Sequence, residues 1–317
     1  MIKKLWIYLA ILLVIGGLWG AVEFYWPQKT EETKQPLLFP NLNPATILEI
    51  RWQRGDQMIQ AKRLTSWAII HPISVPADTK VMEGLLHTLS TLRPEGRFSA
   101  AGKDLSEFGL KAPQLKISFL FDGKWKEMEL GEKNALGMSR YGKLSMVPEV
   151  FLLGDYISRE LDRDLLTLRD KRVFSLDQKQ VQALVIKTDN KPFSFARDSK
   201  GWNVKTTPEK RVITEKVETF LSDLFRLQAK GFGQSDQKKF NPGISASRIQ
   251  LTLMAQGKDG REETLILGKE EPGKGFWAKS PLHKETILLE PTFLKNIPKG
   301  PEEWEEKASP APAKKGP

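Results

Sequence analysis

Two stretches of equal length decide the fold: WAIIHPISVPADTKVMEGLLHTLSTL at residues 67–92 and WNVKTTPEKRVITEKVETFLSDLFRL at residues 202–227. Each opens with a tryptophan, and apolar residues later recur at helical spacing up to a closing leucine. Trp202 lies 135 residues after Trp67, and Leu227 lies 135 residues after Leu92. The constant offset predicts two copies of one unit. In each copy we expect a strand followed by a helix, with Asp78 and Thr214 as the N-caps.

Alternating apolar residues on both sides of these stretches predict further strands. Asp122-Gly123 and Asp259-Gly260 are typical of hairpin turns between them. Short helices are expected near the end of each copy, at 155–161 and 291–297. Consecutive hairpins favour antiparallel sheets with a helix on one face, so we predict an α+β fold built by tandem duplication. The other predicted strands lie at 47–52, 58–64 and 114–121 in the first copy, and at 183–187, 193–197 and 248–254 in the second.

A charge-free stretch, LWIYLAILLVIGGLWGAV, occupies residues 5–22. As a helix it would be about 27 Å long, which is close to the thickness of the hydrocarbon core of a bilayer. Lys3 and Lys4 precede it, so the positive-inside rule places the N-terminus in the cytoplasm. We therefore predict a single transmembrane helix in contact with the lipid bilayer, in the inner (cell) membrane, with the rest of the chain periplasmic or extracytoplasmic. A cleaved signal peptide is the alternative, although the stretch is long and the bulky residues 23–26 follow it.

Changes in composition suggest how the chain is divided. Residues 27–36 (the tether) and 300–317 (the tail) are polar and rich in proline, and the tail is predicted to be disordered. The connector between the copies has charges of alternating sign with leucines among them. The predicted parts are the anchor at 1–26, the tether at 27–36, the first repeat at 37–161, the connector at 162–172, the second repeat at 173–299 and the tail at 300–317.

The 317-residue chain contains 49 Lys and Arg against 39 Asp and Glu, a net charge of +10, and it has no cysteine. A basic surface attracts anionic lipids, anionic polymers or nucleic acid. Nucleic acid is not expected as a partner here, because the domain is predicted to lie outside the cytoplasm. The absence of cysteine excludes disulfides, thiol nucleophiles and cysteine metal sites.

Each candidate catalytic motif in the sequence lacks a residue or a neighbouring element that its chemistry requires. Residues 268–274 match G-x-x-x-x-G-K, but Gly275 follows where a phosphate-binding loop needs Ser or Thr, and a strand is predicted next. Ser235 and Lys238 imitate an S-x-x-K motif without its companion elements. His71, His87 and His283 are not at metal-ligand spacing. We predict a protein that is not an enzyme, with no catalytic, cofactor-binding or metal-binding residues. Acidic residues that converge only in the fold stay open as an alternative.

Tryptophans on sheets can form binding platforms. Trp67 and Trp202 are expected in the core, because they recur in the repeat. Trp125 and Trp277 are the candidates for an interaction surface, and Trp125 lies beside a predicted turn.

Several short motifs follow one another along the chain: Phe39-Pro40, Leu48-Glu49-Ile50, Trp67, Asp104-Leu105-x-x-Phe108-Gly109-Leu110-x-x-Pro113, Leu130-Gly131-Glu132, and the run from Leu168 to Phe174, LRDKRVF. Their order resembles the family catalogued as domain of unknown function 4340, over residues 37–298. The resemblance implies a membrane-anchored, exported protein, encoded near ABC-type transporters similar to gliding-motility systems. It implies no catalytic residues. The second copy departs from the motif at 241–243, which we interpret as divergence in which one half keeps a binding role.

Two functions are therefore expected. The first is a non-enzymatic accessory protein of a membrane complex, with an ABC-type transporter permease as the expected partner. The alternative is a module that binds envelope glycan or lipid, suggested by the basic charge and the tryptophans.

Overall fold

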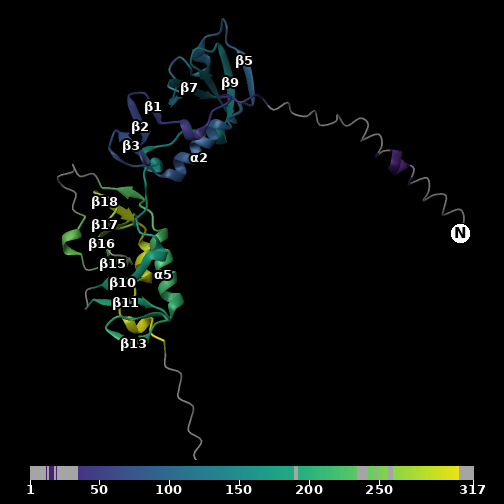
Figure 1. Ribbon diagram of the computed structural model, residues 1–317. Coiled ribbons are helices and arrows are strands. Elements are labelled where there is room, and N and C mark those ends of the chain that lie inside the picture. The colour runs from purple at the N-terminus through teal and green to yellow at the C-terminus, as the bar shows by residue number, and fades with distance from the viewer. Residues whose placement is uncertain are drawn as a thin grey trace, which may run out of the picture. The chain divides into compact units, whose positions relative to one another are not determined.

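The computed structural model describes residues 35–306, apart from 189–191, 234–241, 248 and 256–259 (Figure 1). Nearer the N-terminus it describes only Leu12, 14–17 and Trp19, all helical. Most of the predicted anchor and tether, Asp259, the pair Ser235 and Lys238, and residues 307–317 lie outside the described residues. Within the described part of the chain, no helix is long and apolar enough to cross a membrane.

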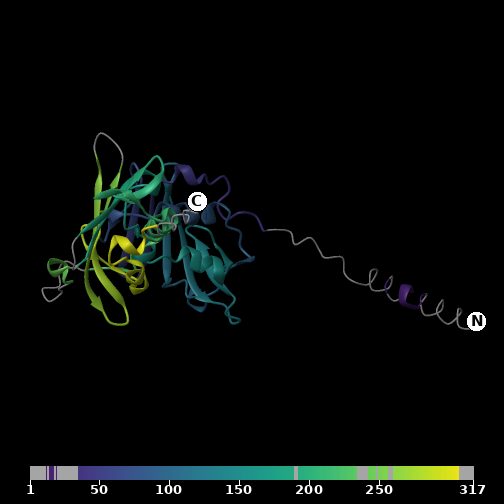
Figure 2. The same cartoon turned by 90° about the horizontal axis from the view of Figure 1, so that it is seen from below.

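The chain divides into two compact units, 1–168 and 169–317. The boundary falls inside the segment 162–172. Each unit is built mainly from strands with a few helices, coloured purple to teal in the first and teal-green to yellow in the second (Figures 1 and 2).

Each unit contains one nine-stranded sheet whose recorded pairings are all antiparallel. The strand orders are β4-β3-β2-β1-β6-β7-β8-β9-β5 and β13-β12-β11-β10-β15-β16-β17-β18-β14, so the second order repeats the first. The predicted α+β duplication is confirmed. The strands of the first unit are β1 Glu49–Arg54, β2 Gln57–Arg63, β3 Trp67–His71, β4 Val75–Pro76, β5 Gly96–Ser99, β6 Leu115–Phe121, β7 Lys124–Lys133, β8 Ser139–Leu144 and β9 Glu149–Gly154. Those of the second are β10 Val181–Lys187, β11 Phe193–Asp198, β12 Gly201–Val204, β13 Thr207–Arg211, β14 Gly231–Phe232, β15 Ile249–Ala255, β16 Glu262–Glu271, β17 Gly275–Lys279 and β18 Thr286–Leu289.

One main helix packs on each sheet, α2 (Thr79–Ser90) in the first unit and α5 (Thr214–Arg226) in the second. Asp78 caps α2 as predicted, since its carboxylate accepts from the N–H groups of Lys80 and Val81. The predicted N-cap of α5 is wrong. Ile213 holds that position without a side-chain cap, because the helix begins at Thr214 itself, and the Thr214 hydroxyl accepts from the Trp202 N–H at 3.4 Å.

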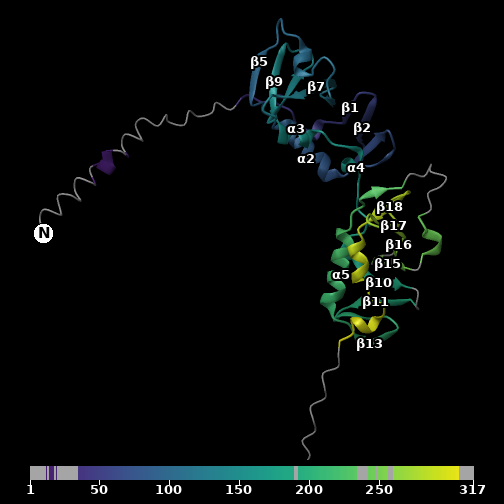
Figure 3. The same cartoon turned by 180° about the vertical axis from the view of Figure 1, so that it is seen from behind.

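Trp67 and Trp202 lie in the two cores, as predicted. The first core also includes α3 (Asp155–Leu161) and α4 (Leu165–Leu168), which lie beside α2 (Figure 3). Helix α3 has the predicted bounds, whereas its counterpart is the 3-10 helix η5, Pro291–Asn296. The other 3-10 helices are η1 Pro44–Thr46, η2 Leu105–Phe108, η3 Gln178–Gln180, η4 Ile244–Ala246 and η6 Pro301–Glu303.

The beginning of the predicted disordered tail is ordered. Trp304, 7% exposed, follows η6 and belongs to the core of the second unit. Its ring stacks on Phe195 at 5.1 Å between centroids, and its carbonyl accepts from the Ile213 N–H at 2.7 Å. Composition predicts disorder here because Pro, Lys and Glu dominate. The buried indole, the hydrogen bond to the Trp304 carbonyl, the Glu306 N–H to Arg211 carbonyl bond (2.9 Å) and the Lys210–Glu305 ion pair (3.0 Å) hold the segment in place.

Two glycines explain the Leu-Gly motifs at the ends of β7 and β16. A Cβ on Gly131 would collide with the Phe108 carbonyl oxygen, and a Cβ on Gly268 would collide with that of Pro242. The loops carrying η2 and η4 can therefore cross the sheet only where glycine leaves room. Gly109 and Gly243 end these approaches with nearly equal left-handed dihedrals, φ 66° and 69°. The apparent departure at 241–243 thus keeps the glycine that the turn requires.

Candidate functional site

The two sheets can be compared position by position, because their strand orders and registers correspond. Lys126 on β7 pairs with Phe119, and Glu263 on β16 pairs with Leu253. Each lies four residues before the leucine of a Leu-Gly pair, which is Leu130 in β7 and Leu267 in β16. Lys126 and Glu263 therefore occupy the same place in the two units.

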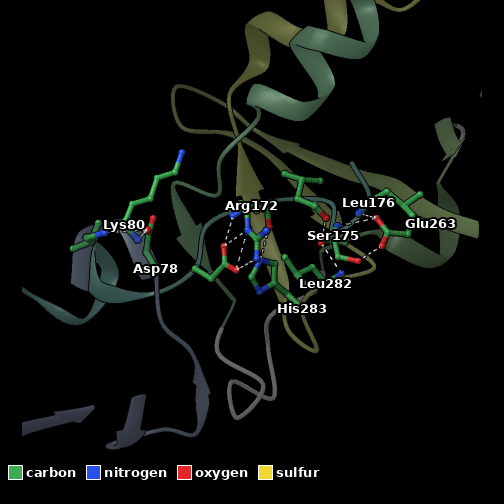
Figure 4. A network of polar contacts seen from close by, with 12 residues as sticks. Asp78, Lys80, Arg172, Ser175, Leu176, Glu263, Leu282 and His283 are labelled. Atoms are coloured by element: carbon green, nitrogen blue, oxygen red, sulfur yellow. Dashed lines mark hydrogen bonds and ion pairs between the residues drawn. The ribbon is translucent and has the colours of Figure 1, made fainter. Parts of the chain in front are cut away.

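In the second unit this place is closed by hydrogen bonds. The Glu263 carboxylate accepts from the N–H groups of Ser175 (2.8 Å) and Leu176 (3.2 Å) and from the Ser175 hydroxyl. The Ser280 hydroxyl donates to the Val173 carbonyl oxygen at 2.6 Å. These contacts, shown in part in Figure 4, join the segment that opens the unit to β16 and the end of β17. We call Ser175, Leu176, Glu263, Ser280 and Val173 the opening clasp.

In the first unit none of the three polar side chains of the clasp is present. Pro40 stands where the second unit has Ser175 and has no N–H to donate. Leu144 replaces Ser280, and Lys126 replaces Glu263. A cavity of about 430 Å³ opens at this place, which we call the Trp125 pocket. Its lining consists of Leu38, Phe39, Pro40, Leu42, Phe121, Trp125, Lys126, Glu127, Leu144, Ser145, Met146 and Val147.

The two predicted surface tryptophans differ in exposure. Trp125 is 42% exposed, and the Arg51 guanidinium lies over its ring at 4.0 Å from the centroid. Glu262 holds the equivalent position in the second unit, so this ring is peculiar to the first. Trp277 is partly buried and less exposed than Trp125, and its Nε1–H donates to Glu271 at 3.0 Å within the same hairpin. Trp125 lines the Trp125 pocket, whereas Trp277 is not part of its lining.

A charged network that the sequence did not reveal covers the face of the first sheet turned away from α2. The Glu49 carboxylate, nearly buried, accepts from Arg51 (2.7 Å) and from the Gln60 amide. Lys116 pairs with Glu129 (2.9 Å) and Glu127 (3.7 Å). The hydrogen bond to Glu129 is the main reason why the pKa of Lys116 lies above its ordinary value.

The equivalent positions of the second sheet carry no charge. By register, Ala183, Val185 and Ser194 stand in for Glu49, Arg51 and Gln60. This replacement shows that the outer faces of the two sheets have diverged, although their strand order has not. Strand pairing was needed to find it, because these residues come from strands far apart in the sequence. The remaining replacements, by the same register, are Gln250 for Lys116, Thr264 for Glu127 and Ile266 for Glu129.

The LRDKRVF motif fastens the start of the second unit. The Arg169 guanidinium lies 3.4 Å from the Phe232 ring centroid and pairs with Glu285 at 3.0 Å. The His283 Nε2–H donates to the Arg172 carbonyl oxygen at 2.7 Å (Figure 4). Burial lowers the pKa of His283 below its ordinary value. Since these groups satisfy one another, we interpret the motif as a structural fastening.

The structure also places the remaining sequence motifs. Residues 268–274 form the end of β16 and the turn to β17, so the G-x-x-x-x-G-K match lies on a hairpin. Within the described ranges, no three His, Asp or Glu side chains gather closely enough to hold a metal ion.

The sequence profile of the family described as Domain of unknown function (DUF4340) matches residues 67–244. No curated protein and no solved structure matches the chain. The matched segment runs from the Trp67 strand of the first unit through the LRDKRVF fastening to η4 of the second. The chain therefore belongs to the DUF4340 family.

Proposed function

We propose that this protein is a non-enzymatic, membrane-anchored extracytoplasmic accessory of a membrane complex, and that its first unit docks the protein partner. The observation that carries the proposal is an asymmetry between two units of one fold. Among the described residues from 35 onward, nine large apolar side chains are exposed in the first unit, against Ile213 alone in the second. Exposed apolar side chains that cluster are typical of interaction surfaces. The nine are Leu48, Leu64, Ile70, Trp125, Leu136, Met138, Met146, Tyr156 and Leu166.

Three of them form what we call the hairpin patch: Leu136 (79% exposed), Met138 (70%) and Tyr156 (70%). The Asp155 N–H donates to the Met138 carbonyl oxygen at 2.8 Å, which brings the loop and the start of α3 together.

The loop is held rigidly by Asn134. Its Oδ1 accepts from the N–H groups of Met138 (3.1 Å) and Ser139 (3.3 Å), and its carbonyl accepts from the Gly137 N–H (2.8 Å). The apolar side chains are thus presented to solvent by an ordered backbone. Binding by such a preorganised loop loses little conformational entropy.

A specific observation favours a second candidate, binding of an anionic envelope polymer or lipid surface. Residues 35–168 contain 17 Lys and Arg against 16 Asp and Glu, whereas residues 169–317 contain 28 against 20. The net charges are thus +1 and +8, so the second unit supplies most of the attraction for anions.

The test places a photo-crosslinking amino acid at Met138 or Tyr156 of the full chain in intact cells, followed by purification and mass spectrometry. Lys274, at the tip of the corresponding β16–β17 hairpin, is the matched control position. We expect the permease of an ABC-type transporter to be crosslinked from the first unit and not from Lys274.

Equal crosslinking from both hairpins, or none from the hairpin patch, would refute docking through the first unit. Co-sedimentation of the protein with anionic envelope polymers or anionic vesicles, without any crosslinked permease, would move the second candidate to first place.

A further inference from the structure

We propose that the Trp125 pocket binds an acyl chain that carries an anionic head group. The chain lies in the pocket, and the head group pairs with Lys126 at its rim. This site goes beyond the proposed function, because it lies apart from the hairpin patch and takes a small ligand.

The pocket lies where the second unit has its opening clasp. The second unit fills the equivalent place with its own carboxylate, Glu263, and satisfies that carboxylate through Ser175 and Leu176. The first unit has removed each element of this closure, through Pro40, Lys126 and Leu144. What is left is a largely apolar cavity with a cation where the second unit has a carboxylate. Glu127 also lines it, but its carboxylate already accepts from the hydroxyls of Ser118 (3.1 Å) and Ser145 (3.0 Å) and pairs with Lys116 at 3.7 Å. A ligand carboxylate beside Lys126 would give this cation a partner of opposite charge, whereas neutral donors satisfy the Glu263 carboxylate in the second unit.

The cavity has the size, the apolar wall and the charged group of a small-molecule site. Its volume of about 430 Å³ lies in the range of small-molecule sites, about 300–1,000 Å³. Leu38, Phe39 and Leu42 form part of its wall and belong to the core, so the depth of the pocket is apolar. The Lys126 side chain is exposed, and no hydrogen bond or ion pair joins its ammonium to another described residue. Its ammonium is therefore available for a head group.

The rim of the pocket carries an exposed methionine on an unusual backbone conformation. Met146 is fully exposed and has a left-handed φ of 66°, which a residue with a long side chain seldom adopts. Strained backbone and exposed apolar side chains persist at sites with a binding role. A flexible thioether suits a chain of variable length, because Met can adapt its shape to its neighbours.

The experiment uses the full chain in phosphatidylcholine nanodiscs and a diazirine-bearing dodecanoate, with labelled peptides mapped by mass spectrometry. The same chain with a trimethylammonium head group is the charge control. A phosphatidylglycerol with a diazirine acyl chain, built into the nanodisc, distinguishes a membrane lipid from a free acid. We expect labelling of peptides that contain residues 38–42, 121–127 or 144–147 by one of the anionic probes, and about tenfold less by the cationic probe.

Lys126→Glu places the charge of the second unit in the pocket and is expected to reduce labelling about tenfold. Lys124→Glu makes the same charge change on the same strand outside the lining and is expected to leave labelling within about twofold. Labelling by dodecanoate assigns a free acid, and labelling by the lipid probe alone assigns a membrane lipid. Absence of label from these peptides with both anionic probes, or equal labelling by the cationic probe, would overturn the proposal. Permease crosslinking from Met138 reads out the proposed function separately.

Discussion

Lys126 and Glu263 hold the same position on corresponding strands, one as an exposed cation and the other as a nearly buried carboxylate. Around Glu263 the opening segment of the unit is drawn in by hydrogen bonds from Ser175 and Leu176. Around Lys126 the segment at Pro40 leaves a cavity. A duplicated fold has thus kept its strand order while one copy closed a site and the other opened it.

Replacing Glu263 by Gln is expected to destabilise the second unit by about 1.5–3 kcal/mol, because an amide group cannot accept all the hydrogen bonds that the buried carboxylate accepts. Hydrogen exchange of β16 and of residues 173–176 would measure the loss. Glu262→Gln, one residue earlier and exposed, is the control and should change exchange little. Equal effects of the two substitutions would show that the clasp contributes nothing.

Gly131→Ala and Gly268→Ala are each expected to destabilise their own unit by about 1–3 kcal/mol, since the new methyl group meets a backbone carbonyl oxygen. Gly84 lies on the exposed face of α2 with open space around it, and Gly84→Ala is expected to stabilise the first unit by about 0.5–1 kcal/mol. Thermal unfolding of the variants measures both signs. A neutral Gly131→Ala would contradict the close approach of η2.

Trp304→Ala is expected to destabilise the second unit by about 3–5 kcal/mol, because the indole packs against Phe195 and Phe220 in the core. A chain ending after residue 299 should lose the same stability, whereas a chain ending after residue 306 keeps every described contact of Trp304. Urea unfolding followed by circular dichroism compares the three. If both truncations behaved alike, the docking of Trp304 would be refuted.

Acid is expected to weaken the second unit through His283. Burial lowers the pKa of His283 in the folded chain below its ordinary value of 6.5, so the unfolded chain binds more protons between these two pKa values. The free energy of unfolding therefore falls as pH drops below 6.5 and stops falling, for this residue, below the folded pKa. His283→Gln keeps a donor for the Arg172 carbonyl oxygen without titrating. Urea unfolding at several pH values should show a smaller pH dependence in that variant, and an unchanged dependence would exclude His283 as the cause.

The duplication, the α+β class, the place of Trp67 and Trp202 in the cores and the family were predictable from the amino-acid order, because they depend on local periodicity and on motifs repeated at a constant offset. Helix α2 with its Asp78 cap was predictable for the same reason. Each of these features depends on the order and spacing of residues along the chain rather than on contacts between distant residues.

The candidate sites could not be predicted in this way, because they depend on residues that meet only in the folded chain. The Trp125 pocket depends on Pro40, Lys126 and Leu144, which come from the segment before β1, from β7 and from β8 and line one cavity only in the folded chain. The difference between Trp125 and Trp277 depends on what packs beside each ring, and Trp304 enters the core from a tail whose composition predicts disorder. Composition averages over neighbours in sequence, whereas burial and hydrogen bonding are decided by neighbours in space.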